Sequence, residues 1–423
     1  MVKNKKIHNI KIGFFLAFRQ LKHASIWTTG LIVVVMMLTF LNLVVVNGIL
    51  VGLIESSIEA SEDRYSGKVI ISTLRQKSII ENSSEIESVL KNLQNVTGIV
   101  PRVLAGGTIQ ADYRRLLKPE ETPNQASTNI SGIIPSEEDK VTGLSNYVID
   151  GTYLDDEDRD GVLVGAFLIN ELTPIDSIGF SQLRNIKVGD RLKLTIGNNS
   201  KEVYLRGILK SKIDNIDARI IMTQSELRKL IGRSDTNVSE IAVKLTPGST
   251  EEDAVRVKNI LIANGYDFDA KIQTAKEAEP KFLKDMKDLF GLLGTLMGSI
   301  GLVVASITVF IVIFVNTLTR RKFIGILKGI GITSKSIEYS YIIQSAFYAI
   351  LGAILGMLVL YGFLVPFIDK HPINFPFSDG ILYAPLSGTL WRVLALFVTT
   401  IIAGYIPARM IVNKNTLDSI LGR

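Results

Sequence analysis

The chain has 423 residues, a net charge of +6 and no cysteine, and 47% of its residues are hydrophobic. Without cysteine it can form no disulfide, thiolate metal site or cysteine nucleophile, and its three histidines lie too far apart in sequence to predict a metal centre. Acidic residues outnumber basic ones between residues 55 and 288, so the basic excess lies in the remaining segments, beside long uncharged runs. This distribution indicates membrane topology and argues against nucleic-acid binding.

The N-terminal segment, residues 1–23, mixes basic and apolar residues and contains no acidic residue. It predicts an amphipathic helix on the cytoplasmic face of a membrane. A secretory signal is the alternative, but the uncharged run that follows is too long and lacks a nearby small-residue cleavage site. Residues 24–64 therefore predict the first transmembrane helix and a stalk, in which Asn47 is interpreted as an interfacial residue with no special role.

Residues 65–279 predict a soluble α+β domain. Strands at 69–72 and 95–104 flank a helix at 84–93, where Ser84 and Glu87 have the spacing of a capping box. A polar, turn-rich stretch at 118–142 then interrupts the pattern, and the next short strands predict a β subdomain inserted at about 118–239. These strands lie at 161–164, 191–196, 203–209 and 219–222, with Gly197-Asn198-Asn199 as a hairpin turn. A strand at 240–245, a helix that ends at Ala263 and a strand at 266–272 complete the domain.

Three more spans follow the domain. We predict a stalk and second transmembrane helix at 280–319, a third at 339–368 and a fourth at 387–408, in which Arg392 snorkels to the outer interface. A cytoplasmic loop at 320–338, an outer loop at 369–386 and a cytoplasmic tail at 409–423 connect and close them. Glycines at three- and four-residue steps predict close helix packing, although glycine is also frequent in membrane helices in general; they are Gly291, Gly294, Gly298, Gly301, Gly352 and Gly356.

The distribution of Lys and Arg predicts the orientation of these spans. Residues 1–23 and the loop at 320–338 are rich in Lys and Arg, whereas the outer segment has only Lys370 and Arg392. The positive-inside rule then places both termini in the cytoplasm and the large domain outside.

Several chemistries are excluded or disfavoured. The sequence has no G-x-x-x-x-G-K-[ST], so it has no P-loop with which to hydrolyse ATP. The acidic run at 155–160 lacks the glycine and glutamate of an EF-hand loop, and no Ser/His/Asp arrangement is credible. A secondary transporter is disfavoured because the spans carry almost no ionisable residue. We therefore predict no catalytic residue, no metal site and no cofactor bound by this chain.

The cytoplasmic loop carries more apolar side chains than a solvated connector needs. The sequence predicts that a partner protein buries them, and a re-entrant helix lying in the membrane is the alternative. The residues predicted to couple to the partner are Arg321, Lys322, Phe323, Ile324, Gly325, Ile326, Leu327, Lys328, Gly329, Ile330 and Gly331.

This loop resembles the permease subunits of the MacB, FtsX and lipoprotein-releasing (LolC/LolE-like) class of ABC transporters, whose phrase is close to E-I-G-I-L-[KR]-A-[LI]-G-A. Phe323 stands where the family usually has Glu, and Gly329 where it usually has Ala. The layout of the whole chain is similar too, down to a closing Pro407-Ala408-Arg409. The resemblance implies a type VII fold: an α-helical membrane protein with four transmembrane helices plus a large extracytoplasmic α+β domain, with a porter-like part and an inserted β subdomain, between helices 1 and 2.

The resemblance also implies a function. The expected role is that of a non-catalytic permease that transmits ATPase-driven motion across the membrane to a domain acting on hydrophobic or amphipathic cargo, such as a lipoprotein, lipid, peptide or drug. The expected partners are a MacB/LolD-like cytoplasmic ATPase carrying ATP and Mg, a second permease copy in a homo- or heterodimer, and a periplasmic adaptor, lipoprotein or hydrolase. The expected location is the bacterial cytoplasmic (inner) membrane. An FtsX-like regulator that activates a cell-wall hydrolase is the alternative.

Overall fold

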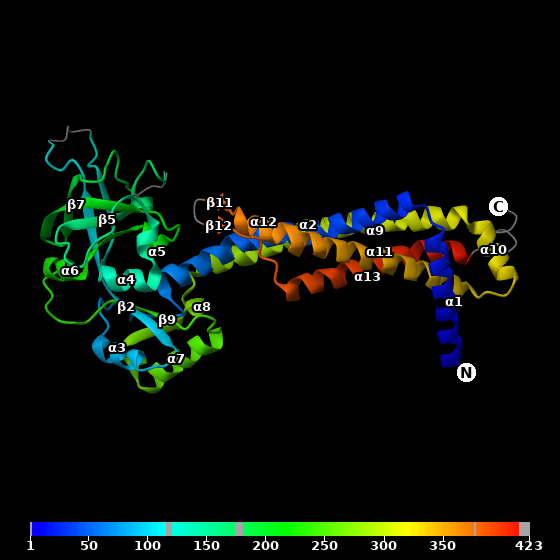
Figure 1. The fold of residues 1–423 in the computed structure, drawn as a ribbon, viewed down its shortest axis with the longest axis horizontal. Coiled ribbons are helices and arrows are strands. Elements are labelled where there is room, and N and C mark those ends of the chain that lie inside the picture. The colour runs from blue at the N-terminus through cyan, green and yellow to red at the C-terminus, as the bar shows by residue number, and fades with distance from the viewer. Residues whose placement is uncertain (1, 116–120, 174–180, 376–377, 414–423) are drawn as a thin grey trace. The chain divides into compact units, whose positions relative to one another are not determined.

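The computed structural model describes residues 2–115, 121–173, 181–375 and 378–413, which form two compact units (Figure 1). The helical unit comprises residues 1–55, 285–373 and 380–423, and the mixed unit comprises residues 56–284 and 374–379. The division falls inside two long helices, so each of these helices contributes residues to both units.

The helical unit is built from the long uncharged runs of the sequence. In chain order its helices are α1 (Val2–Lys22), α2 (Ile26–Ser61), α9 (Lys281–Thr319), α10 (Arg321–Gly329), α11 (Ser334–Val359), α12 (Val365–Lys370) and α13 (Leu386–Val412). Among the described residues, four helical segments are long and apolar enough to cross a membrane: Ile26–Ser66, Lys281–Thr319, Ser334–Lys370 and Leu386–Val412. The prediction of four spans is confirmed, and the fourth helix continues four residues past the predicted end at 408.

The mixed unit contains a sheet in the order β10-β1-β9-β2-β3-β8-β5-β7-β4, with β6 paired to β2 and β7. Its strands are β1 (Val69–Thr73), β2 (Val96–Gln110), β3 (Gln125–Ile133), β4 (Val148–Gly151), β5 (Gly161–Gly165), β6 (Arg191–Ile196), β7 (Asn199–Leu209), β8 (Arg219–Thr223), β9 (Glu240–Leu245) and β10 (Ala270–Thr274). Its helices are α3 (Ser83–Lys91), α4 (Pro135–Thr142), α5 (Asp214–Asp217), α6 (Gln224–Leu230), α7 (Glu251–Ala263) and α8 (Ala275–Ala278). A two-stranded pair, β11 (Ile373–Phe375) and β12 (Ser378–Gly380), lies between α12 and α13.

One long strand, β2, joins two parts of this sheet. Its first half, residues 96–102, pairs with β9, and its second half, residues 103–110, pairs with β3. The part made by β10, β1, β9 and β2 is antiparallel, whereas the other part includes the parallel pairs β3–β8 and β5–β7. The second part therefore begins inside β2, earlier in the chain than the residue 118 expected for the inserted subdomain.

The predicted strands that follow residue 160 have counterparts in β5, β6, β7 and β8, and the turn at Gly197 joins β6 to β7. Two other predictions are wrong. The stretch at 118–142, expected to be turn-rich, contains β3 and α4, because hydrogen bonds to β2 and β8 hold β3 in place although its first half is polar. The predicted capping box is absent, since α3 begins at Ser83, after a left-handed Asn82, and the Ser84 hydroxyl lies 3.1 Å from that of Thr236.

The predicted strand at 266–272 begins later than expected. Its first residues form a 3-10 turn, Tyr266–Phe268, and β10 starts at Ala270. A capping box is present instead at α7, where the Thr250 and Asp253 side chains satisfy the first turn of the helix.

Candidate functional site

The cytoplasmic loop predicted from sequence contains a short helix, α10, followed by a sharp turn. The helix ends where Ile332 N–H donates to Leu327 O and Gly331 adopts φ +96°, a conformation that costs glycine little because it has no Cβ. The Thr333 hydroxyl then accepts a hydrogen bond from Ser336 N–H and caps α11. Residues 320–338 therefore form a helix, a turn and the start of the next helix.

The apolar residues of α10 lie on two different faces. Ile324 and Leu327 are 3% and 7% exposed and belong to the apolar core of the helical unit. Phe323, Ile326 and Ile330 are 51%, 54% and 71% exposed, and their spacing of three and four residues places them on one side of the helix. Of the large apolar side chains among the predicted coupling residues, only this second group is exposed, and we call these three side chains the docking stripe.

The remaining predicted coupling residues surround the docking stripe. Lys322, Gly329 and Gly331 are exposed, Arg321 and Lys328 are half-buried, and Gly325 is buried. Burial lowers the pKa of Lys328, and the nearby Glu338 acts in the opposite direction. The docking stripe is therefore bordered by cationic side chains on the same helix.

Helix α1 packs against the start of α11, close to the turn that follows α10. The Asn9 side-chain oxygen accepts hydrogen bonds from the hydroxyls of Thr333 and Ser336, at 3.1 and 3.3 Å. A methyl group on Gly13 would lie 2.7 Å from the Tyr339 Cβ, and the Gln344 amide donates to Gln20. Residues 1–23 alone predict only a helix that lies on the membrane, because nothing local to this segment identifies α11 as its neighbour.

The glycines predicted to mediate helix packing face α2. A methyl group on Gly294 or Gly298 would lie 2.7–2.8 Å from an atom of Asn47 or Leu43, and one on Gly301 would lie 3.0 Å from the Asn42 oxygen. On α11, the corresponding distances are 2.3 Å, from Gly352 to Met36 and from Gly356 to Phe40.

Gly291 differs from the other five, since a methyl group there would meet no atom within 4 Å. Its carbonyl instead accepts a hydrogen bond of 3.3 Å from the Asn47 side chain, which is buried between α2 and α9. The interpretation of Asn47 as an interfacial residue without a role is therefore wrong. In a lipid bilayer a buried amide gains from such a partner, because no water replaces it.

A buried ionic network in the mixed unit escaped the sequence analysis. Arg102 on β2 donates to both carboxylate oxygens of Glu138 on α4, at 2.6 and 2.8 Å, and to Glu240 on β9 at 2.7 Å. It also donates to the carbonyl oxygen of Tyr65, whose hydroxyl donates to Glu240 at 2.6 Å. Tyr65 lies in the π-helical turn Glu62–Ser66 that continues from α2, so the network joins the end of this helix to β2, β9 and α4. A second guanidinium, that of Arg219, lies over the Tyr65 ring.

Two ion pairs involve the segments that lead from one unit to the other. Lys287 of α9 pairs with Glu55 of α2 within the helical unit. Within the mixed unit, Lys212 pairs with Asp379 of β12 at 2.6 Å, and the Ser56 hydroxyl donates to the Asp379 carbonyl oxygen at 2.6 Å. The predicted outer loop at 369–386 is therefore divided, since residues 374–379 belong to the mixed unit.

Comparison with known proteins finds similar permeases. The family model described as FtsX-like permease C-terminal matches residues 295–416, a region that begins within α9 and includes α10 to α13. An uncharacterized ABC transporter permease of Methanocaldococcus jannaschii is 24% identical over 365 residues, which cover 84% of each chain. The chain is therefore similar to ABC transporter permeases of the MacB/FtsX class.

Other relatives match shorter regions of the chain. The ABC transporter permease YtrF of Bacillus subtilis is 27% identical over 45% of the chain and 43% of its own length. The macrolide export ATP-binding/permease protein MacB of Campylobacter jejuni is 24% identical over 66% of the chain and 43% of its own length. The chain thus spans less than half the length of these two relatives.

Two solved structures are also similar to part of the chain. The periplasmic region of MacB from Actinobacillus actinomycetemcomitans is 13% identical over 49% of the chain, with a TM-score of 0.33. The extracellular domain of the transporter YknZ from Gram-positive bacteria is 14% identical over 49% of the chain, with a TM-score of 0.30. These two likenesses carry no further argument. The resemblance predicted from the sequence is confirmed by the family model and the relatives, and the four membrane-length helices and the mixed unit agree with the predicted fold class.

Proposed function

We propose that this permease transmits the ATP-driven motion of a separate cytoplasmic ATPase to the mixed unit, which acts on hydrophobic or amphipathic cargo outside the membrane. The observation that carries the proposal is the docking stripe: three large apolar side chains, each more than half exposed, on a helix of the cytoplasmic loop. Leaving them in water is unfavourable, so a partner that covers them gains hydrophobic free energy of association.

The buried face of α10 supports a mechanical role. Because Ile324 and Leu327 anchor the helix in the core of the helical unit, a push on the docking stripe is passed to the packed helices instead of being absorbed by a loose loop. Protein interiors are close-packed and compress little, which favours such transmission. The continuous helices α2 and α9, joined by the Lys287–Glu55 pair, then extend from the helical unit into the mixed unit.

The choice of an ATPase as partner rests on the relatives and on the sequence. The Campylobacter relative is named as both an ATP-binding protein and a permease, whereas the 423 residues of this chain contain no P-loop sequence. In this proposal ATP and Mg bind the partner, both termini and α10 lie in the cytoplasm, and the mixed unit lies outside. The basic residues around α10 and in α1 favour this orientation. Two copies of the permease would complete the transporter.

The experiment is co-purification of ATPase activity with the tagged full chain in mild detergent. The double variant Ile326→Asp/Ile330→Asp should lose the activity, because two carboxylates would be desolvated in the interface. The control is Phe268→Asp, which places one such carboxylate at an apolar side chain that is 79% exposed in the mixed unit. If the double variant keeps the ATPase activity of the native chain, the docking proposal is wrong.

A further inference from the structure

The first half of β2 forms an open edge of the sheet. Residues 96–102 pair with β9 on one side, and no strand among the described residues pairs with them on the other. Ser239 N–H donates to Arg102 O, so the main chain of Arg102 faces β9, and because alternate residues of a strand face opposite sides, the main-chain groups of Ile99 and Pro101 face away. The Pro101 ring agrees with this, since proline is tolerated where a strand has no partner for its nitrogen.

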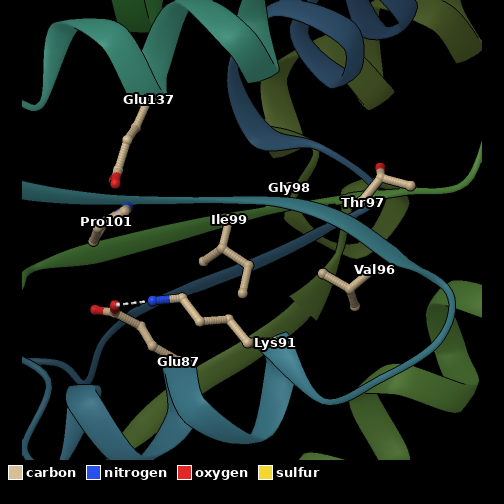
Figure 2. A pocket seen from close by; sticks show the side chains of 8 residues that line it. All are labelled: Glu87, Lys91, Val96, Thr97, Gly98, Ile99, Pro101 and Glu137. Carbon is tan, nitrogen blue, oxygen red and sulfur yellow. Dashed lines mark ion pairs between the residues drawn. The ribbon is translucent and has the colours of Figure 1, made fainter.

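This open edge lines a cavity of about 270 Å³ between α3 and α4 (Figure 2). The close-up shows Glu137 reaching from α4 on one side of β2, and Glu87 and Lys91 from α3 on the other. Val96, Thr97 and Ile99 of β2 form the apolar and main-chain wall between them. The cavity therefore combines a strand edge that no described strand covers with two carboxylates and the Lys91 ammonium group.

The charges of the cavity favour a cationic ligand. Lys91 lies 3.9 Å from Glu87, and its side chain is 68% exposed, so it neutralises Glu87 only loosely. Burial raises the pKa of Glu87 and Glu137 adds to the effect, while Lys91 and Arg228 act in the opposite direction. A carboxylate that is partly desolvated and weakly paired gains from a cation placed closer to it.

We propose that an extended peptide segment carrying a lysine or arginine side chain adds to the free edge of β2 between α3 and α4. The peptide main chain would pair with the N–H and C=O of Ile99, which is half-buried, whereas Pro101 beyond it is buried; this is the pairing seen in other cases of strand addition. The basic side chain would enter the cavity beside Glu87 and Glu137. The competing explanation is that the proline, the charges and the two helices serve only to prevent aggregation at this edge, as such features do in other natural sheets.

This inference goes beyond the proposed coupling function, because it concerns only residues of the mixed unit and needs no ATPase. The test uses the purified full chain in detergent without nucleotide. The probe is a fluorescein-labelled pentapeptide, Thr-Val-Lys-Val-Thr, and its affinity is measured by fluorescence anisotropy. The comparison peptide has the same side chains and charge but is N-methylated at the lysine and both valines, so these three residues cannot donate main-chain hydrogen bonds.

The native chain should bind the first peptide saturably with a dissociation constant below about 1 mM, and the N-methylated peptide about tenfold or more weakly. Glu87→Gln should weaken binding of the first peptide about tenfold. Glu85→Gln makes the same change at an exposed position of α3 outside the cavity and should leave binding unchanged. Equal binding of the two peptides would show that the lysine charge accounts for binding without strand addition, and it would overturn the proposal. So would the absence of binding at about 1 mM peptide.

Discussion

Replacing Arg102 with methionine removes the central cation of the buried network in the mixed unit. Arg102 is 2% exposed and donates four hydrogen bonds, to Glu138, Glu240 and the Tyr65 carbonyl. The variant would leave the Glu138 and Glu240 carboxylates, each less than a tenth exposed, without Arg102, although Arg219 would still act on Glu240. Breaking a buried ion pair by removing one partner costs about 3–5 kcal/mol, because a charge is left buried without compensation. We expect a loss of that size in the stability of the mixed unit.

Hydrogen exchange of the full chain, followed by mass spectrometry, measures this loss where it occurs. Tryptophan fluorescence does not serve, since both tryptophans, Trp27 and Trp391, lie in membrane-spanning helices. In the variant, the free energy of opening that exchange reports for the amides of β2 and β9 should be about 3–5 kcal/mol lower. Arg114→Met, which breaks an exposed pair with Glu202, should leave these rates unchanged. If the opening free energy of the β2 and β9 amides falls by less than about 1 kcal/mol, the reasoning is refuted, because an exposed ion pair contributes that little.

Three further perturbations test other contacts. Gly352→Ala places a methyl group 2.3 Å from a neighbouring side chain and near its main chain, so it should lower the thermal stability of the purified protein, by about 1–3 kcal/mol. Gly291→Ala, which meets no neighbour, should not lower thermal stability, because alanine is at least as favourable as glycine inside a helix. Asp379→Asn should speed amide exchange around β12, since it removes the pair with Lys212; unchanged exchange would mean that the pair does not hold this segment. Burial alone would raise the pKa of Glu240, but nearby guanidinium groups outweigh it and hold that pKa below 4.5. The stability from Glu240 is therefore full above pH 4.5 and lost as pH falls through its folded pKa, which exchange measured at decreasing pH would detect as easier opening of β9. A stability of β9 that stays constant below pH 4.5 would contradict this.

The membrane spans could be predicted from the sequence because the constraint is local. A bilayer core offers no water, so a run of about 20 uncharged residues is sufficient evidence of a helix that crosses it. The same holds for β6 and β7, whose alternating residues and intervening turn are adjacent in the chain. Strand β3 escaped prediction because its first half is polar and its position depends on hydrogen bonds to β2 and β8.

The face of a helix was harder to predict than its presence. Leu327 and Ile330 look equivalent in the sequence, yet the first is buried in the helical unit and the second is 71% exposed. The difference arises from the packing of α10 against α13, far along the chain. Likewise, nothing near Arg102 in the sequence identifies Glu240 as its partner, because they meet only when β2 pairs with β9. Prediction from sequence therefore named the coupling segment but not the side chains that a partner can reach.

Cross-linking from the docking stripe tests the central claim most directly. Because the chain has no cysteine, Ile330→Cys provides a unique site for a photoactivatable maleimide label, and Phe268→Cys provides the control in the mixed unit. After illumination in membranes from the native host, the label at position 330 should attach the chain to a polypeptide that mass spectrometry identifies as an ATP-binding subunit, and the label at position 268 should not. If the label at position 330 attaches no ATP-binding subunit while native complexes retain ATPase activity, α10 is not the site through which the partner acts.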